Sequence, residues 1–210
     1  MALDFAADVP ESAAVFAEAS DALAFDVVAL CRDEDPRLDQ TEFAQPCILT
    51  AEIAMLRGIQ ARFDFAPVLF GGHSLGEYTA LVAAGVVSLS TAVQLVHTRG
   101  RLMQHATPIG FGAMAALMRD DLPLDEIREL GQRHGVDLAN DNSAVQVVVS
   151  GEQHAVDSLC AELAGRYVDG SLRIVPLTVT APFHSRHMVQ VEEAFRPVLE
   201  AARDELNAAE

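Results

Sequence analysis

Apolar positions recur at helical spacing through the first half of the chain. They form stripes over residues 11–24, over a segment from Thr41 to about residue 61, and over residues 90–105. These spacings predict three helices. Because the second is apolar nearly all round, we expect it to be buried, with Thr41 as its cap. The apolar run 67–70 lies between the second and third helices and predicts a buried strand.

The pattern changes after a loop rich in glycine and proline near residue 110. Strand-like runs and helical stripes then follow in the order β-α-β-β-α-β, at residues 113–118, 124–134, 136–139, 145–150, 153–164 and 172–180. This order predicts a ferredoxin-like subdomain over residues 112–178. We expect it to be inserted into an α/β core made of residues 1–111 and 179–210. That core would end in a helix from Arg186 to about residue 208, kinked at Pro197.

The clearest local signal is the turn that follows the predicted strand of the first half. Ser74 stands there between two glycines, Gly72 and Gly76, and a helical stretch that ends at Gly85 comes next. A serine at the tip of a tight strand-to-helix turn is a nucleophile elbow, and small neighbours make room for the strained backbone. The N–H of Leu75 would face the negative charge that develops beside the serine. The alternative is a glycine-rich turn whose serine has no chemical role.

Arg99 falls within the apolar stripe of the 90–105 helix. The other members of this stripe are Ala92, Leu95, Val96, Leu102 and Met103. A buried guanidinium is very costly without an anionic partner. That partner is either a carboxylate of the protein's own core or the carboxylate of a substrate, which arginine holds with two parallel hydrogen bonds. Gly100 beside it predicts close packing, whereas Arg101 is expected at the surface.

A serine nucleophile needs a base, and His184 is the best candidate among seven histidines. It lies in a loop stiffened by Pro182, directly after the last predicted strand, where parallel sheets place their sites. His187 could join it on a metal ion, but no acidic or cysteine partner is close in the sequence, so we expect no metal. His73 is expected to point off the opposite side of the serine turn. The remaining histidines have polar neighbours and are expected at the surface: His97, His105, His134 and His154.

The chain of 210 residues has a formal net charge of −17 and contains no lysine. The acidic balance argues against nucleic acid and anionic membranes as partners. Without lysine, Schiff-base chemistry and a phosphate-binding P-loop lysine are excluded. Cys31, Cys47 and Cys160 lie in apolar patterns and are expected to be reduced core residues of a cytoplasmic protein, without an activating neighbour for Cys47 or Cys160. Neither a signal peptide nor a membrane-spanning run is expected.

Several of these residues recur in a known family, in its order and at about its spacing. The sequence resembles malonyl-CoA:acyl carrier protein transacylases and the acyltransferase domains of polyketide synthases over nearly all 210 residues. The matching segments are Thr41–Pro46, Gly72–Tyr78, Arg99-Gly100 with Met103, Asn142-Ser143 with Gln146–Gly151, and Ala181–Ser185.

The resemblance implies a hydrolase-like parallel-sheet core with the inserted ferredoxin-like subdomain. It implies that a dyad of Ser74 and His184 moves a malonyl group from CoA to the phosphopantetheine thiol of an acyl carrier protein, without a cofactor. Arg99 would pair with the malonyl carboxylate and the N–H of Leu75 would be one oxyanion donor. Phe183 would favour malonyl over methylmalonyl. The matching segments also imply substrate-binding positions at Gln45, Met103 and Asn142.

Two segments of the family fall outside the resemblance. One is an N-terminal strand that ends in Gly-Gln-Gly-Ser-Gln and supplies a second oxyanion donor, and the other is a C-terminal section that orients the catalytic histidine. Two alternatives therefore stay open. One is a truncated remnant, inactive or dependent on a second polypeptide that supplies the missing segments. The other is an acyl-thioester hydrolase on the same scaffold, against which Arg99 argues because water needs no carboxylate clamp.

Overall fold

The computed structural model describes all but eight positions of the chain, and it divides them into two compact units that are treated separately below. The described residues are 1–32, 35–179 and 181–205. The first unit comprises Met1–Leu102 together with the chain from Ala194 onward, and the second comprises Met103–Glu193. The end of the predicted last helix, at about residue 208, lies outside the described residues, as does the last residue of the predicted strand 172–180.

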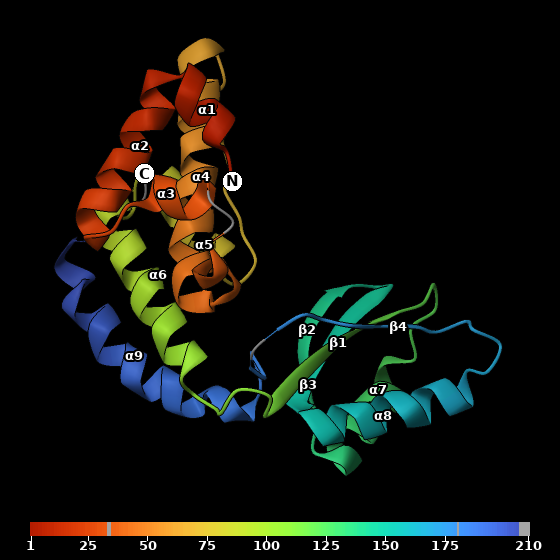
Figure 1. The fold of residues 1–210 in the computed structure, drawn as a ribbon. Coiled ribbons are helices and arrows are strands. Elements are labelled where there is room, and N and C mark those ends of the chain that lie inside the picture. The colour runs from red at the N-terminus through yellow and green to blue at the C-terminus, as the bar shows by residue number, and fades with distance from the viewer. Residues whose placement is uncertain (33–34, 180, 206–210) are drawn as a thin grey trace. The chain divides into compact units, whose positions relative to one another are not determined.

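The first unit is helical (Figure 1). Its core joins side chains from five of its helices, among them the fully buried Phe16, Leu49, Ile53, Val93 and Val96. The long helix α4 runs along α2 and also packs against α1 and α5. The elements are α1 (Leu3–Asp8), α2 (Pro10–Leu23), α3 (Val27–Arg32), the 3-10 turn η1 (Pro36–Asp39), α4 (Thr41–Arg62), α5 (Gly76–Ala83) and α6 (Leu89–Gln104).

The strand predicted at residues 67–70 is not formed. This segment runs in an extended path without strand pairing, and the side chains of Val68 and Leu69 are 91% and 87% exposed. A strand is stable only when a neighbour accepts and donates its main-chain hydrogen bonds, and no described strand lies beside this run. The prediction of a buried parallel strand is therefore wrong for the part of the chain that the structure describes.

Helix α4 has about the predicted length but is less completely buried than predicted. It begins at Thr41, whose side chain does not cap it; the cap position is Gln40. One side is fully buried, but Ile48 and Met55 remain exposed. These exposed positions recur at i and i+7, so a single face of the helix is left open to solvent.

The second unit is built on one small antiparallel sheet. The elements follow the predicted β-α-β-β-α-β order, and the sheet order is β2-β3-β1-β4. Each neighbouring pair is antiparallel. The elements are β1 (Gly112–Met118), α7 (Leu124–His134), β2 (Asp137–Ser143), β3 (Gln146–Glu152), α8 (Gln153–Arg166) and β4 (Arg173–Pro176). Strand β2 is longer than predicted and β4 is shorter.

Alternation along the strands gives the sheet two apolar faces. Leu117, Val147 and Val149 meet α7 and α8 in one core. Met114, Ala116 and Val148 form a smaller cluster on the opposite face, where Phe183 packs. This second face therefore supports the loop that carries His184.

The last described segment is less uniform than the single helix predicted from Arg186. A 3-10 turn, η2 (Arg186–Met188), comes first, and α9 (Val189–Ala201) follows with Pro197 in its interior. A second 3-10 turn, η3 (Arg203–Glu205), closes the described chain. Among the helices described here, none is long and apolar enough to cross a membrane.

Candidate active site

Ser74 adopts the strained backbone expected of a nucleophile elbow. Its φ angle is 54°, in the left-handed region that costs an ordinary residue roughly 1–2 kcal/mol. Gly72 makes this turn possible, because a Cβ atom there would lie 2.0 Å from the carbonyl carbon and oxygen of Gly76. The N–H of Gly76 donates to the carbonyl of His73 at 2.9 Å and closes the turn. Gly76 itself is not sterically required, since a Cβ atom on it would meet open space.

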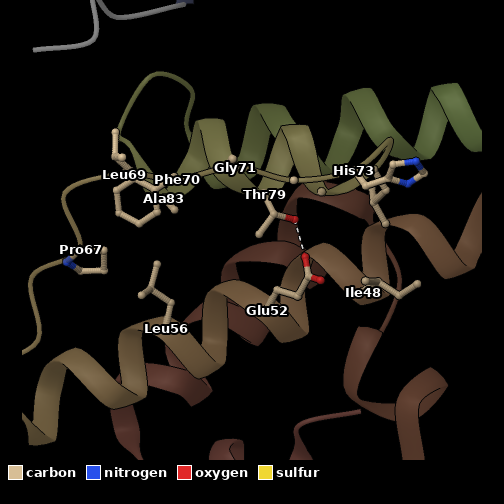
Figure 2. A pocket seen from close by; sticks show the side chains of 14 residues that line it. Ile48, Glu52, Leu56, Pro67, Leu69, Phe70, Gly71, His73, Thr79 and Ala83 are labelled. Atoms are coloured by element: carbon tan, nitrogen blue, oxygen red, sulfur yellow. Dashed lines mark hydrogen bonds between the residues drawn. The ribbon is translucent and has the colours of Figure 1, made fainter. Parts of the chain in front are cut away.

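Helix α5 follows the turn and is fastened at both ends. Gly85 has a φ of 74°, and the N–H of Val86 donates to the carbonyl of Leu81 at 2.9 Å, so the predicted glycine stop is confirmed. Near its start, the hydroxyl of Thr79 donates to Glu52 of α4 at 2.6 Å (Figure 2). Thr79 and Glu52 thus join the elbow helix to α4.

An open cavity of about 660 Å³ lies between α4, α5 and the extended segment that precedes the elbow. In Figure 2 the Thr79–Glu52 hydrogen bond crosses it, with Pro67 at one end and His73 at the other. The walls are otherwise mostly apolar, including Ile48, Leu56 and Phe70. His73 is exposed, and nothing in its described surroundings assigns it a chemical role.

Arg99 lies against Ser74, inside the first unit. Its Nη2 donates to the Ser74 hydroxyl oxygen at 3.0 Å, and its Nη1 donates to Oε1 of Gln45 at 2.7 Å. The guanidinium also lies over the ring of Tyr78, 5.8 Å from its centroid. Burial lowers the pKa of Arg99, and nearby Tyr78 and Glu77 oppose that shift. Both of these hydrogen-bond acceptors are neutral, so neither is the core carboxylate that was one of the two predicted alternatives.

The reach of Arg99 depends on the glycine beside it. A Cβ atom on Gly100 would lie 2.4 Å from the carbonyl oxygen of Thr41, so α6 and the start of α4 are in near backbone contact, as predicted. Gln45 sits on this part of α4, is only 5% exposed, and donates from Nε2 to the Thr41 hydroxyl at 2.9 Å. This bond fixes the amide so that its oxygen faces Arg99. Thr79 and Glu52 were not singled out from the sequence, and no site role was predicted for Tyr78 or for the Thr41 hydroxyl, although both residues stand in the matching segments.

In the second unit, His184 also has a left-handed backbone, with φ at 57°. Pro182 is buried against Gly112, where a Cβ atom would lie 2.2 Å from the proline Cδ. The Ser185 hydroxyl donates to the carbonyl of Pro182 at 2.6 Å and accepts from the N–H of His187 at 3.3 Å. The ring of His187 stacks edge-on against Phe111. Several independent contacts therefore hold the loop on either side of His184.

The other predicted substrate positions have different surroundings. Leu75 occupies the N-cap position of α5. Met103 is buried near the end of α6. Asn142 is exposed at the end of β2, and its amide donates to Gln146 at 3.1 Å. Of the predicted site residues, the structure thus brings Ser74, Arg99 and Gln45 into direct contact.

One expectation about a titratable side chain needs correction, and one contact between cysteines was not predicted. His97 is not a surface residue: it packs against Phe25 and Phe43, and burial lowers its pKa even though Glu42 lies 3.3 Å away. Cys31 and Cys47 are neighbours in space. A hydrogen bond from Cys47 lowers the pKa of Cys31 to about 7, and the same bond raises the pKa of Cys47. The raised pKa values of Cys47 and Cys160 agree with the prediction that neither has an activating neighbour.

No group of three or more His, Cys, Asp or Glu side chains in the described ranges is arranged to hold a metal ion. The pair formed by His184 and His187 accordingly has no third ligand in this part of the chain. Beside Ser74 lies instead the Arg99 cation, which itself contacts the Gln45 amide and the Tyr78 ring, and such a cation suits an organic anion better than a metal.

Comparison with known proteins identifies the relatives of this chain. A family model described as "Acyl transferase domain" matches residues 1–206. The malonyl CoA-acyl carrier protein transacylase of Escherichia coli (strain K12) is 41% identical over 187 residues, which cover 88% of this chain and 60% of that protein. The protein of the same name from Staphylococcus aureus (strain COL) is 36% identical over 201 residues, covering 93% of this chain and 63% of the relative.

Solved structures agree with these sequence relatives. FabD from Acinetobacter baumannii superimposes with a TM-score of 0.87 at 42% identity, over 95% of this chain and 63% of that one. A malonyl-transacylase in complex with a type II PKS acyl-carrier protein gives a TM-score of 0.86 at 39% identity, over 96% and 65%. The chain thus spans about three fifths of the length of the curated relatives named above. None of these comparisons supports a separate polypeptide that supplies further segments. The mixed α/β fold with its small antiparallel sheet matches these structures, and the chain belongs to the acyl transferase domain family.

Proposed function

We propose that this chain carries the machinery for moving a malonyl group from CoA to the phosphopantetheine thiol of an acyl carrier protein. The observation that carries the proposal is the contact between Arg99 and Ser74. A nucleophile with a desolvated guanidinium 3.0 Å from its oxygen suits an acyl group that itself ends in a carboxylate. The names of the sequence relatives point to the same substrate class.

In the proposed reaction, the Ser74 oxygen attacks the thioester carbonyl while His184 accepts the serine proton. The carbon–sulfur bond then breaks, and the protonated His184 returns a proton to the departing CoA thiolate. The N–H of Leu75 stabilises the oxyanion of the intermediate. In the second half, the carrier thiol gives its proton to His184 and attacks the acyl-serine. The bond between the acyl carbon and the Ser74 oxygen then breaks, His184 returns the proton to that oxygen, and the malonyl-thioester of the carrier protein is released.

Arg99 and Gln45 form the carboxylate clamp in this proposal. The malonyl carboxylate replaces the Ser74 hydroxyl as the acceptor for Nη2 of Arg99, which also frees the serine oxygen to attack. Gln45 keeps its contact with Nη1 and holds the guanidinium plane in place. Met103 and Asn142 are proposed to line the path of the substrate, on the strength of the family resemblance alone.

Phe183 is proposed to set the size of the accepted acyl group. Its ring is held by the apolar sheet face formed by Met114, Ala116 and Val148, so it has little freedom to move aside. A bulky ring next to the base occupies the space that an α-methyl group would need. Steric exclusion of one methyl group is worth about 1–3 kcal/mol.

The finer fold assignment also belongs to this proposal. We assign residues 112–178 to a ferredoxin-like subdomain, which the β-α-β-β-α-β order and the β2-β3-β1-β4 sheet support. Residues 1–111 and 179–210 are then the hydrolase-like α/β core. The left-handed Ser74 at the start of α5 supports this part.

Mass spectrometry of the protein after incubation with malonyl-CoA tests the proposed function. The expected product is one malonyl adduct on the tryptic peptide of residues 63–99, which Ser74→Ala abolishes and His184→Gln slows. Ser90→Ala is the matched control, because this serine lies on the same peptide and its hydroxyl bonds Glu18 instead. An adduct on Cys31 or another cysteine would sink the proposal. Adduct formation followed by release to water, with no transfer to a carrier protein, would favour the hydrolase alternative.

A further inference from the structure

One carboxylate fastens the loop of His184 to the sheet. Asp137, the first residue of β2, accepts a hydrogen bond from the backbone N–H of Arg186 at 2.7 Å. The same carboxylate accepts from the Arg186 side chain, with Nη2 at 2.6 Å from Oδ1 and Nε at 3.1 and 3.0 Å from the two oxygens. Arg186 lies two residues after His184, so this fork grips the chain immediately beyond the left-handed turn.

This contact differs from an ordinary surface ion pair. Exposed pairs of long side chains contribute little because both partners lose freedom when they meet. Here Arg186 is 56% exposed but Asp137 is only 25% exposed, and the carboxylate binds backbone as well as side chain. Arg186 lowers the pKa of Asp137, chiefly through these hydrogen bonds, and His187 adds a smaller effect in the same direction. The tether therefore remains charged at every pH at which a histidine base could work.

The remaining contacts of the loop fix its first half. Pro182 is wedged against Gly112, and Phe183 packs on the sheet. Upstream of His184 the chain is thus held by apolar packing, and downstream by Asp137 together with the Ser185 and His187 contacts described above. A residue in the left-handed region relaxes to the right-handed or extended region unless both of its flanks are held. Such a relaxation at His184 would swing the imidazole through a large arc.

We propose that Asp137 is a positioning residue for His184, acting through Arg186. Asp137 holds the peptide units after His184 in the orientation that aims the imidazole at its reaction partner. The carboxylate does not itself touch the substrate or exchange a proton with the histidine. This inference rests on the proposed function, in which His184 is the base, and it assigns the salt bridge on β2 a part in that chemistry.

The test compares Asp137→Ala with Asp141→Ala, a matched control on the same strand. Asp141 is exposed, and its carboxylate lies 4.0 Å from Arg128 of α7 instead of binding Arg186. Asp137→Ala is expected to slow malonylation of Ser74 by about ten- to a hundredfold at saturating malonyl-CoA, with KM unchanged, because the base is misplaced by an ångström or more. The rate profile against pH should also shift, since the imidazole changes its surroundings. Asp141→Ala should change neither.

Two further variants separate positioning from general loss of structure. Asp137→Asn keeps an oxygen that can accept from the Arg186 N–H and should recover part of the rate. Arg186→Ala removes the side-chain bonds but keeps the backbone N–H that donates to Asp137, so it should slow the reaction less than Asp137→Ala does. The double variant should be no slower than Asp137→Ala alone, as expected for residues that act as one unit. Thermal unfolding of each variant checks that the fold is intact. Additive losses in the double variant, or an unchanged pH profile, would overturn the inference.

The ring of His184 gives a readout that does not depend on activity. Its Cε1–H resonance, assigned through His184→Gln, should move and broaden in Asp137→Ala and stay in place in Asp141→Ala. If wild-type protein forms no malonyl adduct, the proposed function fails, yet the resonance still decides whether Asp137 sets the position of the ring. An unmoved resonance in Asp137→Ala rejects the positioning role regardless of the adduct result.

Discussion

The turn that carries Ser74 and the loop that carries His184 each hold a residue in the left-handed region, but by different contacts. Both residues have a left-handed backbone, with φ at 54° and 57°, and neither is glycine. The serine turn is held sterically, by the backbone contact between Gly72 and Gly76. The histidine loop is held by polar bonds to Asp137 and Ser185 and by a proline wedge. A turn held by close backbone contact tolerates no larger side chain at the contact, whereas a loop held by hydrogen bonds can lose them one at a time.

Enlarging the residue at this close backbone contact should give the largest effect. Gly72→Ala would force a Cβ atom to within 2.0 Å of the Gly76 carbonyl, so the turn must open and Ser74 must move. A displaced nucleophile should lower the rate of malonylation by at least about a hundredfold. Gly71→Ala is the control, because a Cβ atom there meets nothing within 4 Å. Adduct formation followed over time distinguishes the two, and equal rates would refute the steric account of the turn.

Removing the cation beside the serine should come next. Arg99→Ala should cost malonyl transfer about 2–5 kcal/mol, because a desolvated charge pair with the acyl carboxylate is lost. Acetyl transfer, which has no such carboxylate, should persist or improve. Arg101→Ala, two positions along the same helix, is the exposed control. Rates measured with both thioesters decide the matter: an equal loss for malonyl and acetyl would make Arg99 a structural residue.

A smaller effect is expected at the side chain next to the histidine. Phe183→Ala should raise the rate with methylmalonyl-CoA relative to malonyl-CoA, since it opens the space that an α-methyl group needs. The difference between the two activation free energies should change by about 1–3 kcal/mol. Phe111→Ala is the control: it removes a ring of the same unit, but this ring contacts His187. It should not change the preference between the two thioesters. Competition between the two thioesters measures the ratio. A wild-type preference for methylmalonyl would contradict the size argument.

Lowering the pH should destabilise the first unit before the second, and this is the smallest of the expected effects. Burial lowers the pKa of His97, so its contribution to stability is full above pH 6.5 and is lost as the pH falls through the lower folded value. Asp137 also has a lowered pKa, and its contribution is lost only as the pH falls below 3.8. Hydrogen-exchange protection, taken relative to the intrinsic exchange rate at each pH, should therefore be lower in α6 at pH 5 than at pH 7.5 and equal in η2 at the two pH values.

The replacement His97→Phe provides the internal check on that comparison. A phenylalanine keeps the edge contacts with Phe25 and Phe43 but has no proton to gain. The acid-dependent exchange of α6 should then disappear. Its persistence in the variant would assign the effect to other groups of the first unit.

The sequence predicted what depends on neighbouring residues in the chain. The serine turn, the glycine stop at Gly85, and the strand and helix order of the second unit all follow from local pattern, and the structure bears them out. Pattern also placed Arg99 on a buried face and Gly100 at a close contact. These features are encoded by spacing and by residue size, both of which can be read directly.

Features that depend on distant residues were missed. The run 67–70 has strand composition, but a strand also needs a partner whose position the local sequence does not give. The burial of His97 between two aromatic rings and the pairing of Cys31 with Cys47 join separate elements in the same way. Asp137 and Arg186 are 49 residues apart and carry no pattern that links them. The roles given to Met103 and Asn142 came only from resemblance and are still predictions.

The near contact at Gly100 restricts which substitutions this chain could accept at position 100 during evolution. Any side chain at position 100 would push α6 away from the carbonyl of Thr41, and the guanidinium of Arg99 would then leave both of its acceptors. A lineage that altered the spacing of these two helices would have to alter position 100 and the reach of the cation together. A single substitution at position 100 would misalign α4 and α6 and would remove Arg99 from Gln45 and Ser74. The contact between Arg99 and Ser74 thus depends on a residue that has no side chain at all.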